Sequence, residues 1–214
     1  MTIDVNEIFF SIQGESTYAG LPCGFVRLAG CNLSCSYCDT RYATIVEERL
    51  EIEEILERIR TFGCRRVEIT GGEPLLQAET PELIRRLLDT GYTVLLETNG
   101  SMNINTVDPR CVRIVDIKCP SSGESGQIDW QNLDRLTKDD QLKFVLSDRT
   151  DFIFAVETLQ RVPDRLPSEH VLFSPVWGLL SPAVLAQWIL ETGIDVRLHL
   201  QLHKWIWPEI ERGV

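Results

Sequence analysis

Short apolar runs rich in β-branched residues alternate along the chain with segments that have the apolar spacing of helices. The expected strands are Phe25–Leu28, Val67–Thr70, Thr93–Thr98, Val112–Lys118, Gln141–Leu146, Val171–Phe173 and Val196–Leu200. Most of these runs are apolar throughout, which is typical of parallel strands covered on both faces. Repeated units of this kind predict an α/β fold. We expect an incomplete TIM-like (β/α)6 barrel with its ligand groups at the carboxyl ends of the strands.

An apolar stripe at positions i, i+3, i+4 and i+7 predicts a helix between the first two strands, with its apolar side facing the sheet. The stripe consists of Ile52, Ile55, Leu56 and Ile59. Acidic residues from Glu47 to Glu57 fall in the same region, and we interpret them as the solvated face of a helix.

Two further helices are indicated by the residues at their ends. One is expected to have Thr80 as its N-cap and Pro81 at its first position, and to stop at Gly91. The other is expected to start at Ser181–Pro182 and to end at Gly193. Its expected buried face consists of Val184, Leu185, Trp188 and Ile189.

Composition and charge narrow the class of protein. The 214 residues are 43% hydrophobic and 25% charged, as in an ordinary globular protein, and we expect one domain spanning residues 1–214. The net charge of −11 disfavours binding to nucleic acid. No apolar run approaches the roughly 18 residues that a membrane span needs, and the first residues lack the pattern of a signal peptide. We therefore expect a cytoplasmic location without membrane contact.

Three of the seven cysteines are close together in the sequence. Cys31, Cys35 and Cys38 have the spacing C-x3-C-x2-C and follow an expected strand. Cysteine thiolates are the usual ligands of iron–sulfur clusters, and three on one loop leave the fourth iron of a [4Fe-4S] cubane open to a ligand. A non-catalytic zinc-binding module is the alternative, but structural zinc needs four ligands. Cys23 or Cys64 is the available fourth thiol, and neither forms a second C-x2-C pair.

The cysteine loop, with Tyr37 before its last cysteine, resembles the cluster-binding loop of the radical S-adenosylmethionine (SAM) superfamily. The segment Thr70–Pro74 resembles the second motif of that superfamily, which contacts the methionine amino group of SAM. The resemblance implies that the cluster binds SAM and that a 5′-deoxyadenosyl radical takes a hydrogen atom from the substrate. The implied SAM-binding positions are Tyr37, Cys38, Asp39, Gly72, Glu73, Lys118, Pro120, Ser121, Ser122, Ser174, Pro175, Val176 and Trp177.

Further motifs along nearly the whole chain resemble those of the 7-carboxy-7-deazaguanine synthase family. They are Glu7–Ser16, Gly24–Leu28, Asp39–Thr40, Glu97–Gly100, Asp116–Gly123, Lys143–Val145, Ser174–Val176 and Gln201–Lys204. The resemblance implies a carbon–nitrogen lyase of queuosine and 7-deazapurine biosynthesis, which converts 6-carboxy-5,6,7,8-tetrahydropterin to 7-carboxy-7-deazaguanine with loss of ammonia. It also implies magnesium, a homodimer and a flavodoxin or ferredoxin-type electron donor. Another radical SAM reaction, such as activation of a glycyl-radical enzyme, is the alternative.

The same resemblance assigns substrate and magnesium positions, with the N-terminal and C-terminal segments closing the substrate site. The substrate positions are Ile12, Gln13, Gly14, Glu15, Arg27, Thr70, His203 and, through its carboxylate, Val214. Arg27 is expected to bind the substrate carboxylate by two hydrogen bonds, and Gln13 or Glu15 to pair with the aminopyrimidinone edge. Thr40 is the expected magnesium ligand. We expect no catalytic side chain, because the radical is generated on SAM, and we expect His199 to be a packed or surface histidine.

Overall fold

The computed structural model describes all residues from Met1 to Val214 and contains one nine-stranded sheet. Its strands are β1 (Thr2–Ile12), β2 (Pro22–Leu28), β3 (Glu48–Glu51), β4 (Arg66–Gly71), β5 (Thr93–Thr98), β6 (Val112–Ile117), β7 (Gln141–Leu146), β8 (Val171–Pro175) and β9 (Arg197–Leu198). The order in the sheet is β3-β1-β2-β4-β5-β6-β7-β8-β9. All neighbours from β2 to β9 are parallel, whereas β1 is antiparallel to both β2 and β3. The sheet is therefore mixed and open, and the expected α/β fold with an unclosed barrel is confirmed.

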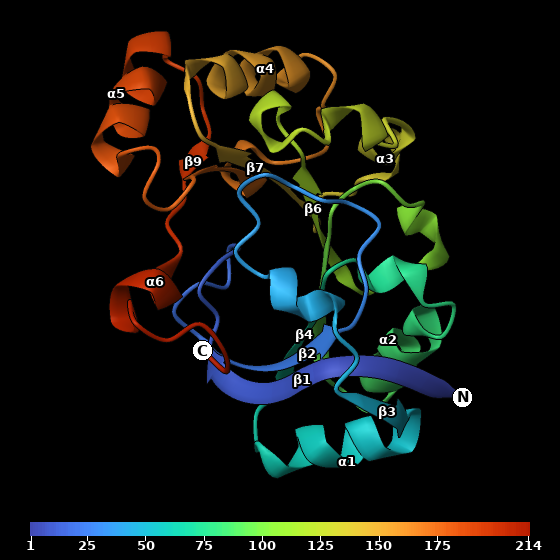
Figure 1. The fold of residues 1–214 in the computed structure, drawn as a ribbon. Coiled ribbons are helices and arrows are strands. Elements are labelled where there is room, and N and C mark those ends of the chain that lie inside the picture. The colour runs from blue at the N-terminus through green and yellow to red at the C-terminus, as the bar shows by residue number, and fades with distance from the viewer.

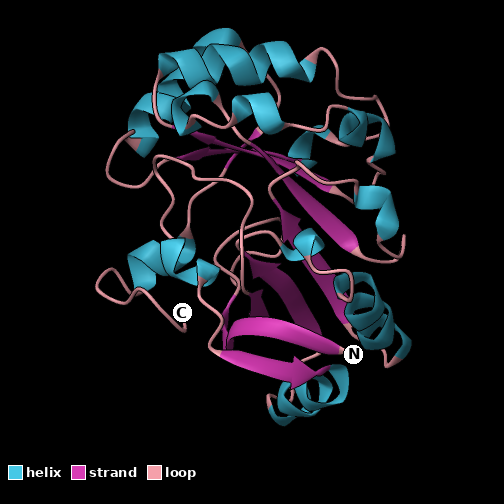
Figure 2. Cartoon of the chain, turned by 45° about the vertical axis from the view of Figure 1, so that its right-hand side comes forward, coloured by secondary structure: helices cyan, strands magenta, loops and turns pink.

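Six α-helices accompany the sheet. They are α1 (Ile52–Thr61), α2 (Thr80–Asp89), α3 (Gln131–Arg135), α4 (Arg149–Leu159), α5 (Pro182–Thr192) and α6 (Leu202–Ile206). Figure 1 shows α1 beside the N-terminal strands at one end of the molecule and α4 and α5 at the other. In Figure 2 the strands form a strongly twisted sheet between these two groups of helices. No helix has both the length and the apolar character that crossing a membrane requires.

Two apolar cores fill the space between the sheet and the helices. The first joins the inner stripes of α1 and α2 to β1, β2, β4 and β5, and includes Ile55, Ile59 and Leu83. The second joins β6, β7 and β8 to α3, α4 and α5, and in it Phe152 and Phe173 meet edge to face at 5.9 Å between ring centroids. Each such fully buried side chain stabilises the fold by about 1.5–3 kcal/mol. These cores hold the strand ends in fixed positions.

The opposite side of the sheet is polar, because successive side chains of a strand point to opposite faces. On β4, Val67 and Ile69 belong to the first core, whereas Glu68 and Thr70 line a cavity on the other side. A small apolar cluster of Leu95, Val112, Ile114 and Tyr18 packs on this inner side. The polar residues of the inner side are the ones that form the site.

Several sequence expectations differ from the structure at their boundaries. Thr93–Thr98 and Gln141–Leu146 are strands with the predicted bounds, but only Arg197–Leu198 of the last predicted strand pairs with β8. Helix α2 begins at Thr80, with Glu79 as its N-cap, so the predicted start was one residue late. Val184 of α5 is 38% exposed and is not part of the buried face.

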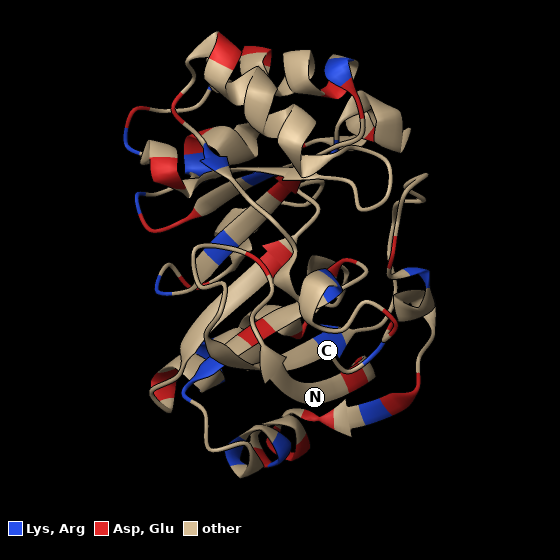
Figure 3. Ribbon diagram, turned by 90° about the vertical axis from the view of Figure 1, so that its left-hand side faces the viewer, with Lys and Arg blue, Asp and Glu red and all other residues tan.

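Two strands, β1 and β3, were not predicted at all. Glu48–Glu51 was interpreted as part of a helix face, but it is the edge strand β3 and pairs with Thr2–Val5 of β1. Figure 3 shows that acidic and basic residues occur along both β3 and α1. Some of them form surface ion pairs, such as Arg58 with Glu48 at 2.5 Å, and each such pair contributes about 0–1 kcal/mol.

Candidate functional site

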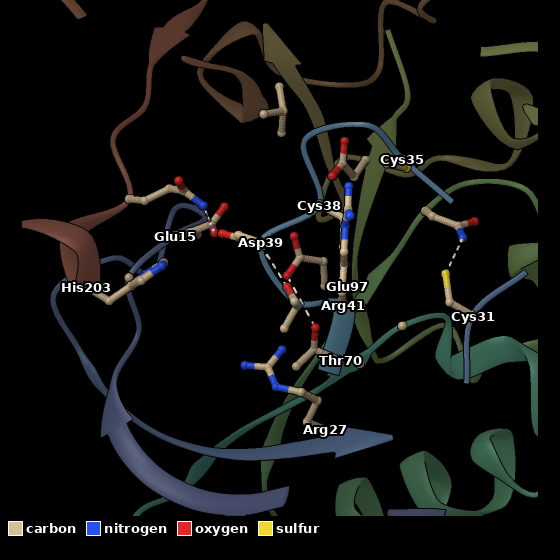
Figure 4. Close-up of a pocket in the computed structure, with 18 of the residues that line it drawn as sticks. Glu15, Arg27, Cys31, Cys35, Cys38, Asp39, Arg41, Thr70, Glu97 and His203 are labelled. Carbon is tan, nitrogen blue, oxygen red and sulfur yellow. Dashed lines mark hydrogen bonds between the residues drawn. The ribbon is translucent and has the colours of Figure 1, made fainter. Parts of the chain in front are cut away.

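A cavity of about 630 Å³ opens at the carboxyl ends of the parallel strands. Its walls come from the hairpin between β1 and β2, the cysteine loop, the ends of β4 to β7 and the C-terminal segment after β9. This volume is typical of small-molecule sites, which measure roughly 300–1,000 Å³. Figure 4 shows Glu15 and His203 on one side of the cavity, Cys31 on the opposite side, and Arg27 and Thr70 below.

The cysteine loop follows β2, and all three of its thiols line the cavity. None of the three is in a disulfide; Cys31 is half-buried, Cys35 is buried and Cys38 is exposed. Backbone hydrogen bonds fix the loop, including one from Gly30 N to Ala43 O at 2.9 Å. Burial raises the pKa of the Cys35 thiol, while the nearby Lys118 ammonium lowers it. Lys118 therefore favours the thiolate form that a metal centre requires.

These thiols fit a [4Fe-4S] cluster better than a zinc ion. No group of three or more His, Cys, Asp or Glu side chains converges as the ligands of a single metal ion do. In a cubane each thiolate binds a different iron, so the sulfurs are spaced more widely than the ligands of one zinc ion. Three free thiols on one loop that faces a single cavity satisfy that requirement.

The segment Thr70–Pro74 is packed directly against the cysteine loop. A Cβ atom on Gly72 would lie 2.2 Å from the Gly30 carbonyl oxygen and 2.6 Å from Cys31 Cβ, so only glycine fits there. The next residue donates a hydrogen bond from Glu73 N to Gly30 O at 2.9 Å. The two motifs identified in the sequence therefore form one structural unit at the cavity wall.

The predicted SAM positions divide into those at the cavity surface and those behind it. The surface positions are Tyr37, Cys38, Asp39, Gly72, Lys118, Val176 and Trp177. The remaining positions do not line the cavity; they are Glu73, Pro120, Ser121, Ser122, Ser174 and Pro175. Their predicted contacts with SAM stay predictions.

Among the positions behind the surface, Glu73 and the serine loop have clear structural partners. The Glu73 carboxylate is fully buried and accepts hydrogen bonds from Thr98 Oγ1 at 2.9 Å and Asn99 N at 2.7 Å. Ser122 O accepts a hydrogen bond from Ser36 N at 3.0 Å, which ties the loop after β6 to the cysteine loop. These residues hold the wall of the cavity in place.

All eight predicted substrate positions line the same cavity as the cysteines. Arg27 is held by an ion pair from its Nε to Glu7 Oε1 at 2.7 Å, and its guanidinium carbon lies 5.7 Å from the ring centroids of both Phe9 and Tyr42. Its two terminal nitrogens make no hydrogen bond within the protein. They are therefore free to form the paired hydrogen bonds that a carboxylate accepts.

A network of buried charges forms the floor of the cavity. Lys143 is almost fully buried and forms ion pairs with Glu15 and with Glu97, the latter at 2.6 Å. Burial acts to raise the pKa of Glu15, but the Lys143 ammonium lowers it below its ordinary value. Glu15 also accepts a hydrogen bond from Gln201 Nε2 at 2.9 Å. Gln13 lies beside this network and donates a hydrogen bond to Glu68.

The C-terminal segment lines the cavity and contacts both the β1–β2 hairpin and the cysteine loop. Leu202 N donates to Gly14 O at 2.9 Å, and a Cβ atom on Gly14 would lie 2.2 Å from His203 Nδ1. Lys204 forms an ion pair with Asp39 of the cysteine loop at 3.1 Å. His203 lies on α6, beyond the predicted strand Val196–Leu200, of which only Arg197–Leu198 forms β9.

Two other predicted positions have defined surroundings. Thr40 lines the cavity, and its hydroxyl donates a hydrogen bond to Asp39 Oδ1 at 2.8 Å. His199 is 4% exposed and does not line the cavity, in agreement with its reading as a packed residue. Its Nε2 has no hydrogen-bond partner, and burial lowers its pKa to about 4.

Sequence reasoning assigned no role to Glu68 or Arg41, and included Glu7, Glu97 and Lys143 only as parts of motifs. All except Glu7 line the cavity. Glu68, Glu97 and Lys143 had a detectable signature, because each is a charged residue within an otherwise apolar strand. A parallel strand covered on both faces does not accommodate an unpaired charge, so such positions indicate a polar interior.

Comparison with known proteins agrees with this geometry. The chain matches the Radical SAM superfamily over residues 26–113. It is 42% identical to the 7-carboxy-7-deazaguanine synthase of Koribacter versatilis (strain Ellin345), over 99% of this chain and 100% of that relative. It is 43% identical to the enzyme of that name from Chlorobaculum tepidum, over 99% of this chain and 97% of that relative. The crystal structure of QueE from Escherichia coli has the same fold, with a TM-score of 0.78 at 23% identity over 95% of both chains.

The superfamily match implies a [4Fe-4S] cluster, SAM and a reductant, and the three free thiols at the cavity fit the cluster. The relatives extend over nearly the full length of the chain, so they cover both the cysteine loop and the C-terminal segment. The chain therefore belongs to the 7-carboxy-7-deazaguanine synthase family of radical SAM enzymes.

Proposed function

We propose that this chain converts 6-carboxy-5,6,7,8-tetrahydropterin to 7-carboxy-7-deazaguanine, with loss of ammonia. The observation that carries the proposal is that all eight expected substrate positions line one cavity together with the three cysteines. His203, Lys204 and Val214 of the C-terminal segment line the cavity, and a site bounded by this segment favours a small molecule over a polypeptide as substrate. Activation of a glycyl-radical enzyme is therefore the less suitable function for this site.

Different residues of the cavity are proposed to bind different parts of the substrate. The cluster and SAM, when bound at Cys31, Cys35 and Cys38, supply a radical that removes a hydrogen atom. Arg27 then has the free donors to bind the substrate carboxylate, with Glu7 fixing its orientation. Glu15 has the acceptor chemistry for the aminopyrimidinone edge, whose N–H groups are donors. The C-terminal segment excludes water from the cavity and so protects the radical.

Magnesium, a second subunit and the electron donor belong to the same proposal. Thr40 is the proposed magnesium ligand, because its hydroxyl is a hard oxygen donor at the cavity surface beside Asp39. We further propose that the enzyme is a homodimer and that a flavodoxin or ferredoxin-type protein donates the electron. These three points follow from the family resemblance and are open to direct measurement.

The deciding experiment is a product assay. The reconstituted protein is incubated anaerobically with SAM, a reductant, magnesium and the carboxytetrahydropterin, and the products are analysed by mass spectrometry. We expect 7-carboxy-7-deazaguanine, a reduced yield without magnesium, and no product from Cys35→Ala. Intact SAM cleavage without the deazaguanine would show that the substrate is a different molecule.

A further inference from the structure

Glu68 is the least explained charged residue of the cavity. It lies on the inner face of β4, two residues before Thr70, and lines the cavity although it is only 4% exposed. The neighbouring residues Val67 and Ile69 point into the apolar core on the other face. The position of Glu68 is therefore fixed by an interior strand, which has three strands on one side of it in the sheet and five on the other, and not by a flexible loop.

The two carboxyl oxygens of Glu68 have different surroundings. Oε2 accepts a hydrogen bond from Gln13 Nε2. Gln13 cannot exchange its amide ends freely, because its Oε1 accepts a hydrogen bond from Glu15 N at 3.0 Å. Oε1 of Glu68 has no hydrogen-bond partner in the protein. It is also not among the unpaired polar atoms that are buried away from any open space. It is therefore directed to the cavity.

Glu68 also has no cation of its own. Lys143 is engaged by Glu15 and Glu97, and no ion pair reaches Glu68. Burial, followed by the neighbouring Glu97 carboxylate, raises the pKa of Glu68 to about 8. In the ionised form both carboxylate oxygens are acceptors, and the protein supplies a donor to Oε2 alone. A ligand N–H group at Oε1 supplies the missing donor and favours that form.

We propose that Glu68 is a substrate-specificity residue, whose Oε1 accepts a hydrogen bond from the exocyclic amino group of the aminopyrimidinone edge. This inference rests on the proposed function and adds a contact that tells an aminopyrimidinone from a ring with oxygen in place of the amino group. Glu68 thereby recognises the substrate with one oxygen and holds Gln13 in position with the other.

Glu68→Gln isolates the acceptor role. The amide has nearly the same shape as the carboxylate but keeps only one acceptor oxygen. Its oxygen must stay opposite Gln13 Nε2, so its NH2 group takes the place of Oε1 and faces the ligand. The NH2 group of the variant then faces the exocyclic amino group of the ligand, and two hydrogen-bond donors cannot pair. Glu57→Gln, on the exposed surface of α1, is the matched control, since the Glu57 side chain is 72% exposed.

The test uses two stable oxidised probes, 6-carboxypterin and its 2-oxo analogue 6-carboxylumazine. Their affinities are measured by anaerobic titration calorimetry on the cluster-loaded protein with SAM. We expect the wild type and the control to prefer the pterin by about tenfold or more, and Glu68→Gln to lose most of that preference through weaker pterin binding. SAM affinity should be unchanged in all three proteins.

Two results would overturn the proposal. One is a wild type that binds both probes equally or binds neither, a comparison that needs no variant to fold. The other is a Glu68→Gln variant that keeps the full preference for the pterin. Product formation from the tetrahydropterin by the wild type is scored separately, so the proposed reaction can stand while the role of Glu68 fails.

Discussion

Replacement of Gly72 by alanine tests whether the contact between the two sequence motifs positions the cluster. The added Cβ would lie 2.2 Å from the Gly30 carbonyl oxygen, and 3.4 Å is the lower end of ordinary contact. The backbone at Gly30 and Cys31 must then move by about 1.2 Å, because neither contact is the far end of a flexible side chain.

The magnitude follows from this overlap. Overpacking of this kind costs about 1–3 kcal/mol. For a chain of this size each kcal/mol lowers Tm by about 2–4 °C, so we expect a decrease of roughly 2–12 °C. Functional sites tolerate displacements of only about 0.5 Å, so the shift of Cys31 should also reduce cluster binding and SAM affinity.

The assay compares Gly72→Ala with Gly126→Ala. Gly126 has no positive φ, and an added Cβ there meets nothing within 4 Å, so this control changes the same residue type without a clash. Each protein is reconstituted anaerobically, and its iron content, its absorbance near 400 nm and its Tm are measured. If Gly72→Ala binds iron and SAM as well as the control does, the contact does not position the cysteine loop.

Three further predictions concern residues around the site and in the core. Glu7→Gln should raise the KM for the pterin about fivefold by releasing Arg27, with uncoupled SAM cleavage unchanged, and steady-state kinetics would contradict this by showing an unaltered KM. Asp140→Ala should lower the free energy of unfolding by about 3–5 kcal/mol in urea titrations, because it leaves the buried Arg113 guanidinium unpaired; a loss below 1 kcal/mol would show that water replaces the carboxylate. Burial lowers the pKa of His199 to about 4, so between pH 6.5 and pH 4 the unfolded chain binds a proton that the native protein does not. The free energy of unfolding should therefore fall by about 3 kcal/mol as the pH is lowered from 6.5 to 4. His199→Asn should remove most of this pH dependence in urea titrations at pH 7 and pH 4.

The sequence predicted the parallel part of the fold because local pattern and tertiary packing agree there. Gln141–Leu146 and Thr93–Thr98 are strands with the predicted bounds, and the α1 stripe faces the first core. The antiparallel edge was missed because its information is not local. The four residues of β3 are mostly exposed and charged, and only their pairing with Thr2–Val5 makes them a strand.

The continuous motifs of the site were predicted from the sequence, whereas the residues brought together from separate strands were not. The cysteine loop and Thr70–Pro74 are recognisable because each motif is continuous in the sequence. The roles of Glu68, Glu97 and Lys143 depend on three separate strands meeting at the cavity floor, and no spacing within the chain expresses that arrangement. A charged residue in an apolar strand indicates that something compensates it, but only the structure identifies the partner.

The residues expected to bind the cluster and SAM come from other parts of the chain than the residues expected to bind the substrate. The three cysteines and Gly72 come from two loops that touch each other directly, and no backbone hydrogen bond joins these four residues to the C-terminal segment. The substrate positions, in contrast, depend on Gly14 and His203, which meet only when the C-terminal segment lies on the β1–β2 hairpin. Changes in the C-terminal segment should therefore weaken substrate binding while SAM cleavage persists. Changes in the cysteine loop should abolish both, because the substrate reacts only with a radical generated there.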